Sequence, residues 1–314
     1  MVAPAQPLMH GITRLDTLQS RAGMAACYAI VRNGEVAFVE AGTSPGVPAL
    51  LAWLESEGLS VEQVRYVMPT HVHLDHAGGA GLLMRACPNA RLVVHPRGAR
   101  HMIDPTALIA GATAVYGPEM VKAEYGEIAP IAADRVDSAE DGSRWALGDT
   151  QLQILDAPGH AKHHYCVYDA TSQGLFTGDV FGLSYREFDT AKGPFLIPTT
   201  TPVQFDPDAW HDTLDRLLAT GAERAFLTHF GVVEGLSALA ATLRRGIDDY
   251  VQLARAAPNG EGRHEALRNS VAALAHRQLR AHGVTLDDAR IEHILGLDFD
   301  LNAQGLGVWL DKVG

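Results

Sequence analysis

The order of apolar and polar positions along the chain changes character near residue 232. Before it, short β-prone runs alternate with amphipathic helical segments, a pattern that predicts an α/β domain with buried strands. After it, apolar residues recur at helical spacing in two long stripes that begin at Leu236 and Leu267. We therefore expect residues 1–231 to form an α/β domain and residues 232–314 to form a helical C-terminal extension that packs on it.

Individual apolar runs predict the elements of the first part. Residues 25–31 and 36–39 flank Asn33-Gly34, a dipeptide typical of a primed hairpin turn. Residues 64–68 are apolar and β-prone and predict a buried strand. Further strands are expected at 91–94, 149–156, 165–168, 175–177 and 225–227, and helices at 47–57, 96–102 and 208–219.

One polar segment interrupts this pattern directly after a predicted strand. Residues 70–76 read Thr-His-Val-His-Leu-Asp-His. His71 and His73 are two residues apart, so in an extended chain their rings leave on the same side and can chelate one metal ion. Asp75 and His76 point elsewhere and suit a second ion. Open α/β folds place their sites at the carboxyl ends of strands, which is where this segment lies.

A His-x-His-x-Asp-His sequence after a short apolar strand resembles the signature of the metallo-β-lactamase-fold hydrolase superfamily, in its glyoxalase II and lactonase-like branch. The resemblance covers roughly residues 20–231. It implies a catalytic domain with a metallo-β-lactamase-like four-layer αβ/βα sandwich, here followed by the helical extension. It also implies three further metal ligands downstream, and the chain offers His160, Asp179 and His229 in that order.

The resemblance distributes the seven side chains over two metal ions. The implied ligand sets are His71, His73 and His160 for one ion, Asp75, His76 and His229 for the other, and Asp179 as a bridge between them. Imidazoles and carboxylates without a thiolate suit Zn(II), Fe(II) or Mn(II), and we expect two divalent ions, with zinc preferred. After two aspartates and a bridging hydroxide, about one positive charge would remain to attract a carbonyl or phosphoryl oxygen.

Four side chains in or near these motifs are candidates for a catalytic or substrate-binding role. Asp75 is placed to orient the attacking hydroxide and to shuttle its proton. Tyr185 follows Asp179 by six residues. In some lactone and ester hydrolases of this fold a tyrosine donates a hydrogen bond to the developing oxyanion, and the alternative is that Tyr185 packs the loop down. His163 and His164 precede a predicted strand, where neighbours face opposite sides, so at most one is expected to face the metals.

Several segments carry less pattern. Residues 40–43 occupy the place where similar proteins carry a short polar loop near the metals, and a plain turn is an equal alternative. Prolines and glycines break residues 104–134, which predict a helical excursion that walls one side of the site, while residues 181–205 predict a loop. In the extension a short third helix is expected near 286–295, followed by a docked tail at 297–310. By the resemblance, the extension lies over the metals and supplies part of the substrate pocket.

Composition narrows the partners and the compartment. The formal net charge of −12 comes without a run of lysines or arginines, which argues against nucleic acid, since phosphate binding needs clustered positive charge. No stretch has the ~20 apolar residues of a membrane helix, and the N-terminus lacks signal-peptide features. Cys27, Cys87 and Cys166 form no close pair and predict free thiols in a reducing cytoplasm. A small-molecule substrate is expected as partner, with a homodimer as an alternative use of the helical stripes.

Residues and resemblance together predict a dinuclear metal-dependent hydrolase that acts on an ester, thioester or lactone. Asp179 stands where true β-lactamases of the commonest zinc subclass carry a cysteine, which disfavours β-lactam cleavage. Three alternatives stay open: a phosphodiesterase, an iron-dependent oxygen-using enzyme, and a metal-stabilised binding protein without turnover. The absence of a basic patch in the sequence argues against a phosphodiesterase, and the presence of His73 argues against the oxygen-using iron enzyme. The intact ligand set argues against a binding protein without turnover.

Overall fold

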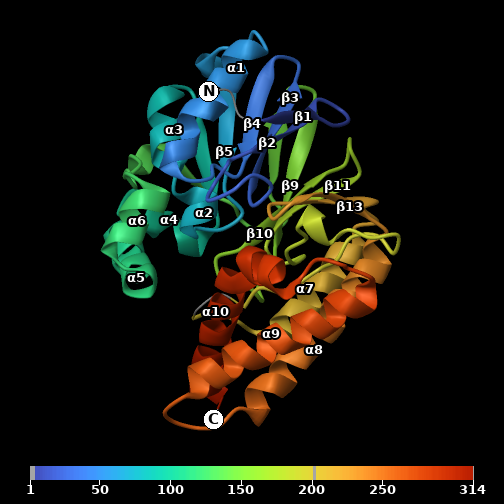
Figure 1. Cartoon of the computed structure of the whole chain (residues 1–314). Helices are drawn as coiled ribbons and strands as arrows, with labels where there is room; N and C mark the ends of the chain where they lie inside the picture. The colour runs from blue at the N-terminus through green and yellow to red at the C-terminus, as the bar shows by residue number, and fades with distance from the viewer. Residues whose placement is uncertain (1–3, 201–202, 314) are drawn as a thin grey trace. The chain divides into compact units, whose positions relative to one another are not determined.

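The computed structural model describes residues 4–200 and 203–313. In these residues two β-sheets and helices α1 to α10 follow one another along the chain (Figure 1), which confirms the expected α/β class with C-terminal helices. Two compact units are present. The first holds the chain up to Asp156 with residues 163–178 and 222–232, and the second holds the remainder. Segments 157–162 and 179–221 thus group with the C-terminal helices, and the boundary expected after residue 231 stays a prediction.

The first sheet contains seven strands in chain order, antiparallel from β1 to β4 and parallel from β4 to β7. Asn33 and Gly34 have φ angles of 47° and 80°, so the hairpin between β3 and β4 has the predicted primed turn. The strands are β1 (Ala5–Pro7), β2 (Ile12–Asp16), β3 (Ala26–Arg32), β4 (Glu35–Val39), β5 (Val64–Met68), β6 (Arg91–Val94) and β7 (Val136–Ser138).

The second sheet has the order β13-β12-β11-β10-β9-β8, and β11 pairs with β12 in parallel. An apolar layer joins the inner faces of the two sheets, where Tyr28 packs edge-on against Phe176 and Phe226 at centroid distances of 5.4 and 5.5 Å. The strands are β8 (Arg144–Leu147), β9 (Thr150–Asp156), β10 (Tyr165–Asp169), β11 (Gly174–Gly178), β12 (Arg224–Leu227) and β13 (Gly231–Glu234).

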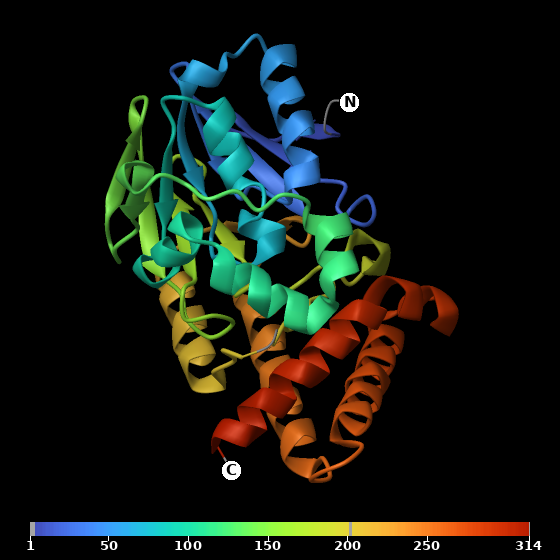
Figure 2. The ribbon, with the colours of Figure 1, turned by 90° about the vertical axis from the view of Figure 1, so that its left-hand side faces the viewer.

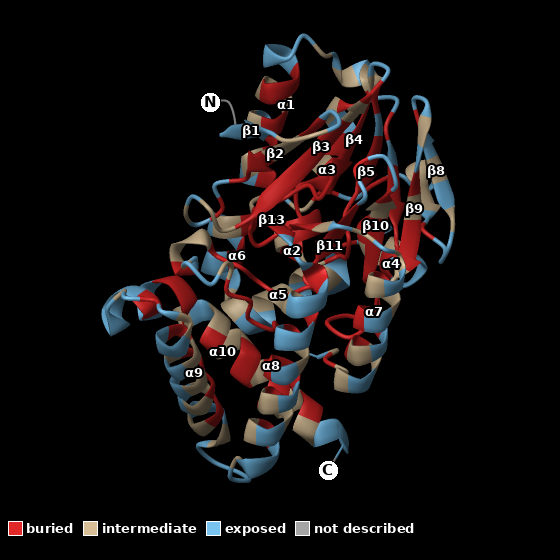
Figure 3. Cartoon of the chain, turned by 90° about the vertical axis from the view of Figure 1, so that its right-hand side faces the viewer, coloured by how far each residue is buried: buried red, intermediate tan, exposed pale blue. Residues whose placement is uncertain are grey.

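Helices cover the outer face of the first sheet. A second apolar layer buries Trp53 of α1 (Val47–Ser56) against Phe38, together with side chains of α3 (Ala80–Ala86) and α4 (Pro96–Ile103). Strands β3, β4, β5 and β6 of this sheet are accordingly buried on both faces over most of their length, whereas β1 at its edge is exposed (Figure 3). Burial on both sides explains why their sequences read as continuous apolar runs.

The expected helical excursion is confirmed as α5 (Thr106–Tyr116) and α6 (Pro118–Tyr125), which follow α4 in green (Figure 2). Val121 and Tyr125 of α6 pack on Leu74 in a small apolar cluster of their own. Leu74 begins α2 (Leu74–Ala77), the short helix that carries Asp75 and His76. The excursion therefore lies against the histidine segment, as the sequence predicted.

The second unit contains α7 (Pro207–Ala219), α8 (Leu236–Ala256), α9 (Arg263–His282) and α10 (Asp288–Val313), and its loop at 181–205 includes one short 3-10 turn at Arg186–Phe188. Residues 201 and 202 of that loop lie outside the described residues. In the described part of the chain, none of the helices has the length and apolarity needed to cross a membrane.

Two expectations for the C-terminal region are wrong. Helix does not begin at Val232, because the β-branched pair Val232-Val233 extends the second sheet as β13 and α8 begins only at Leu236. The short third helix and the separate tail are one helix, α10, of 26 residues. Its buried positions continue at helical spacing from Ile291 to Trp309, and no proline interrupts them.

Candidate metal centre

The candidate ligands all follow strand ends. His71, His73, Asp75 and His76 come after β5, and His229 comes after β12. His160 and Asp179, in the second unit, follow β9 and β11. Parallel strands β4 and β5 end at the same edge of the first sheet, so the residues after β4 lie beside the histidine segment.

Two glycines make room for this arrangement. Gly178 has φ +49°, and a Cβ there would lie 2.3 Å from Thr70 Oγ1 and 2.5 Å from His164 Nε2. Gly159, with φ +134°, would place a Cβ 2.5 Å from that of Trp210. Only glycine fits both the backbone angle and the space, so the residues immediately before Asp179 and His160 are fixed by sterics.

Asp75, His76 and His229 form a candidate metal-binding group within the first unit. Their ligand atoms all lie within 4.8 Å of one another. His76 Nε2 is 3.4 Å and His229 Nε2 is 3.3 Å from the same oxygen, Asp75 Oδ2. His76 is fully buried and His229 nearly so, whereas a quarter of the Asp75 side chain is exposed, so the group opens to solvent at the aspartate.

The other ring nitrogens decide what these Nε2 atoms offer. His229 Nδ1 lies 2.7 Å from the Met24 carbonyl oxygen, and His76 Nδ1 lies 3.0 Å from Glu40 Oε1. A carbonyl and a carboxylate only accept, so both Nδ1 atoms carry the proton. A neutral ring then turns its Nε2 lone pair toward Asp75 Oδ2, placing two acceptors beside a third. A divalent cation among them satisfies all three atoms at once, so these residues fit a metal ion.

His160 and Asp179 repeat this pattern within the second unit. His160 Nδ1 donates to the Thr199 carbonyl oxygen at 2.9 Å, and its Nε2 lies 3.5 Å from Asp179 Oδ2. The His160 side chain is fully buried and that of Asp179 is 5% exposed. Here too an imidazole lone pair faces a carboxylate oxygen, and both are buried. An imidazole nitrogen and a carboxylate oxygen are typical ligands of a divalent metal ion.

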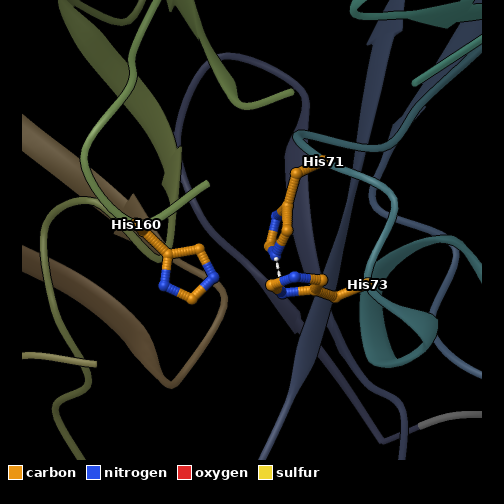
Figure 4. Close-up of side chains that lie close together, drawn as sticks. All are labelled: His71, His73 and His160. Carbon is orange, nitrogen blue, oxygen red and sulfur yellow. Dashed lines mark hydrogen bonds between the residues drawn. The ribbon is translucent and has the colours of Figure 1, made fainter. Parts of the chain in front are cut away.

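His71 and His73 meet each other in the first unit. His71 Nε2 and His73 Nδ1 are 2.8 Å apart, as the dashed line in Figure 4 shows; the same figure draws His160. Thr70 Oγ1 donates to Glu40 Oε1 at 2.7 Å, so it accepts from His71 Nδ1 at 3.2 Å. His71 therefore also presents an Nε2 lone pair. The two rings lie together as expected, and their chelation of one ion stays a prediction.

Glu40 holds these histidines, whereas the sequence indicated only that residues 40–43 form either a polar loop near the metals or a plain turn. Its buried carboxylate accepts from the Thr70 amide at 3.1 Å, from the Thr70 hydroxyl, from His76 Nδ1, and from the Thr228 hydroxyl at 2.9 Å. One anion thus fixes the residues before both His71 and His229 and the tautomer of His76. The sequence signals were its place in the 40–43 segment and an acidic residue directly after the strand that precedes β5.

The charge state of Asp75 suits a metal ligand. Burial works against its negative charge, but as long as His76 and His229 carry an Nε2 proton that no metal ion has replaced, the positive charge of His76 and the hydrogen bond from His229 outweigh burial and hold the pKa of Asp75 well below its usual value. The carboxylate is therefore ionised at neutral pH, as metal binding requires.

The remaining predicted residues lie in two places. His163 and His164 both lie beside His71, with ring centroids 6.1 and 4.8 Å from that of His71. Because β10 begins only at Tyr165, strand alternation does not apply to these two residues, and the expectation that at most one of them faces the metals stays a prediction. Tyr185 is buried in the second unit, 1% exposed, immediately before the 3-10 turn of the 181–205 loop.

Comparison with known proteins gives a family match to the metallo-beta-lactamase superfamily over residues 20–229. A metallo-beta-lactamase fold-containing protein of Sulfurisphaera tokodaii, ST1585, is 26% identical over 55% of this chain and 63% of its own length. Its solved structure superposes with a TM-score of 0.64, covering 96% of this chain and 99% of that chain at 20% identity, which shows the fold alone.

Two further curated relatives have names that state an activity. The acyl-coenzyme A thioesterase MBLAC2 of Gallus gallus is 26% identical over 56% of this chain and 64% of its own. The hydroxyacylglutathione hydrolase of Ectopseudomonas mendocina is 30% identical over 59% of this chain and 54% of its own. The matched part of the chain thus covers between about half and just under two thirds of the length of each of these curated relatives.

The contacts of Glu40 predict that Glu40→Gln weakens metal binding. A glutamine amide group would face hydroxyl and imidazole donors with donors of its own, leaving buried groups unsatisfied at about 1–3 kcal/mol. We expect metal affinity to fall by about 10- to 100-fold, because residues that orient a ligand typically contribute that much. Chelator competition measures the affinity, and urea unfolding measures the loss of stability.

Asp169→Asn is the matched control for this prediction. Asp169 is a fully buried carboxylate of the same unit, paired with Arg32 at 2.9 Å. Its replacement should lower stability and leave metal affinity as in the wild type. If Glu40→Gln and Asp169→Asn lower stability equally and neither alters metal affinity, Glu40 supports the loop and not the histidines.

Proposed function

This chain belongs to the metallo-β-lactamase superfamily, and we propose that it is a dinuclear metal-dependent hydrolase acting on the carbonyl group of an ester, thioester or lactone. The proposed sets are His71, His73 and His160 for one ion, Asp75, His76 and His229 for the other, and Asp179 as the bridge, in agreement with the groups of His and Asp able to bind metal.

One observation carries the proposal. His76, His229 and His160 each donate Nδ1–H to an oxygen that only accepts, and each turns Nε2 toward a carboxylate oxygen 3.3 to 3.5 Å away. Three imidazoles, each with Nδ1 bound to a fixed acceptor and Nε2 beside a carboxylate oxygen, have the arrangement of divalent metal ligands, which supports the proposal.

Two divalent ions bound by these ligands would supply Lewis acidity and a water ionised near neutral pH. Asp75 is the most exposed of the three residues in its group, so a water entering from solvent reaches it first. We propose that its carboxylate orients this water and holds its proton. Attack of the water oxygen on the carbonyl carbon then breaks the bond to the alcohol or thiol, which leaves with a proton. Tyr185 stays our candidate for a hydrogen bond to the developing oxyanion.

A carbonyl substrate is supported over a phosphodiester by two observations. The relatives named above are a thioesterase and a hydroxyacylglutathione hydrolase, and both names state hydrolysis of an acyl compound. The chain also has 37 acidic residues against 25 basic ones, which disfavours a polyanionic substrate.

The helices beside the candidate centre favour an apolar acyl group. The eleven residues of α5, all of them described, include no charged residue and no buried one. Val115, Met120 and Ile103 rank among the exposed large apolar side chains, and all three lie on or next to this helix. Tyr125 connects the excursion to Leu74, next to Asp75. We propose that this uncharged surface accommodates the acyl part of the substrate.

The proposed reaction predicts that the purified protein hydrolyses chromogenic esters, thioesters or lactones. Removal of metal with a chelator should lower the rate by about 100-fold or more, since the ions supply both the nucleophile and the polarisation. Added zinc should restore it. Activity on a phosphodiester alone, at a rate that exceeds every carbonyl substrate, would establish the phosphodiesterase alternative instead.

The apolar excursion predicts a preference for longer acyl chains. Each methylene that the protein buries contributes about 0.8 kcal/mol, so kcat/KM should rise by up to about fourfold per methylene in an acyl ester series. Val115→Lys should flatten this rise and leave the shortest ester unaffected. Leu297→Lys, which places the same charge at an exposed apolar position of α10, is the control. A flat series in the wild type would contradict the assignment.

A further inference from the structure

The last helix reaches one of the proposed ligands through a short connection. We call residues Thr199 and Thr200, at the end of the described part of the 181–205 loop, the strap. The Thr200 amide donates to Asn302 Oδ1 at 2.7 Å, and the Thr200 hydroxyl donates to the Asn302 carbonyl oxygen at 3.0 Å. Asn302 lies in the middle of α10, so this helix binds the strap by both side chain and backbone.

The other residue of the strap binds His160. The Thr199 carbonyl oxygen accepts the proton of His160 Nδ1 at 2.9 Å. This bond selects the tautomer whose Nε2 bears a lone pair, and it sets the rotation of the ring. Thr199, Thr200, His160 and Asn302 are all between 0 and 5% exposed, so water cannot substitute for these contacts.

Asn302 is an unexpected residue at its position. It lies on the buried face of α10 between Phe299 and Leu306, where an apolar side chain would pack without a polar group to satisfy. Its amide nitrogen approaches the Tyr250 hydroxyl of α8 at 3.5 Å, which leaves Oδ1 directed at the strap. The contacts with Thr200 therefore account for a buried amide that packing alone would not require.

Two glycines bring helix backbones against the same segment. A Cβ at Gly305 of α10 would lie 1.5 Å from the Thr200 carbonyl oxygen, and a Cβ at Gly246 of α8 would lie 2.8 Å from Pro198 Cγ. Both glycines are inside helices, where glycine is otherwise unfavourable relative to alanine. The close approach gives each of them a reason, and it holds the strap in one position.

We propose that Asn302 is a positioning residue for His160, acting through the strap, so that the C-terminal helices take part in building the metal centre. This inference rests on the proposed function to the extent that His160 is a metal ligand. It goes further in assigning the last helix a role in metal affinity, in addition to any contact with substrate.

The test is metal affinity in the full chain. Asn302→Leu removes the acceptor and retains an apolar filler of similar size, and Asn302→Asp retains an acceptor oxygen at the same place. Zinc affinity by chelator competition, and the absorption spectrum of the cobalt-substituted protein, report the ligand field without reference to turnover. We expect Asn302→Leu to weaken one of the two ions by about 10- to 100-fold and to change the cobalt spectrum, and the second ion to bind as in the wild type. Asn302→Asp should recover most of the affinity.

Two further variants separate positioning from general stability. Phe299→Leu removes packing from the same buried face of α10 and should lower the melting temperature with both affinities unchanged. Gly305→Ala adds one methyl group against the Thr200 carbonyl and should reproduce the selective loss of one ion; it carries the test if Asn302→Leu does not fold.

The outcomes are distinct. A wild-type protein that binds two ions and hydrolyses a carbonyl substrate, together with a folded Asn302→Leu or Gly305→Ala of unchanged affinity, would overturn this inference and leave the proposed function standing. Equal loss of metal in Asn302→Leu and Phe299→Leu would also overturn it, because the effect would then be stability alone. A wild type that binds no second ion would instead remove the proposed function.

Discussion

The candidate centre depends on a simple property of imidazole: a buried ring can present a lone pair only if its other nitrogen gives its proton to an acceptor. For His229, His160 and His76 the acceptor is an oxygen that cannot donate: the carbonyl oxygens of Met24 and Thr199 and the carboxylate of Glu40. The protein thereby fixes the tautomer before any ion arrives. Contacts between the strands, and between the last helix and the 181–205 loop, hold the Met24, Glu40 and Thr199 oxygens in place.

The two-sheet architecture explains how such distant oxygens reach the rings. Tyr28 in the first sheet donates to the Leu227 carbonyl oxygen at 2.6 Å, and the Ala26 amide donates to the Thr228 carbonyl oxygen at 2.9 Å. These bonds tie the end of β12 to β3, so that His229 faces the loop that contains Met24. A sandwich with an apolar interior thus fixes the polar groups along its rim, where the strands end.

The sequence was informative where the chemistry is local. The strands before His71, His160 and Asp179 were predicted from runs of a few residues, and the structure confirms all three as β5, β9 and β11. Glu40 and Asn302 could not be found in this way. Their contacts join residues 188 and 102 positions apart, to Thr228 and Thr200, and no periodicity records such pairs. The length of α10 was missed although its buried positions keep helical spacing, because the glycine at 305 is explained only by the strap it meets.

The account stands on two ions bound by the proposed ligand sets, and anomalous X-ray scattering at the zinc edge measures this directly in crystals of the zinc-loaded protein. We predict two anomalous peaks about 3.5–4 Å apart, the spacing of dinuclear hydrolytic sites. Asp179 should contact both peaks, His160 only one of them, and Asp75 only the other. A single peak bound by Asp75, His76 and His229 alone, with His160 and Asp179 contacting no metal, would contradict the account.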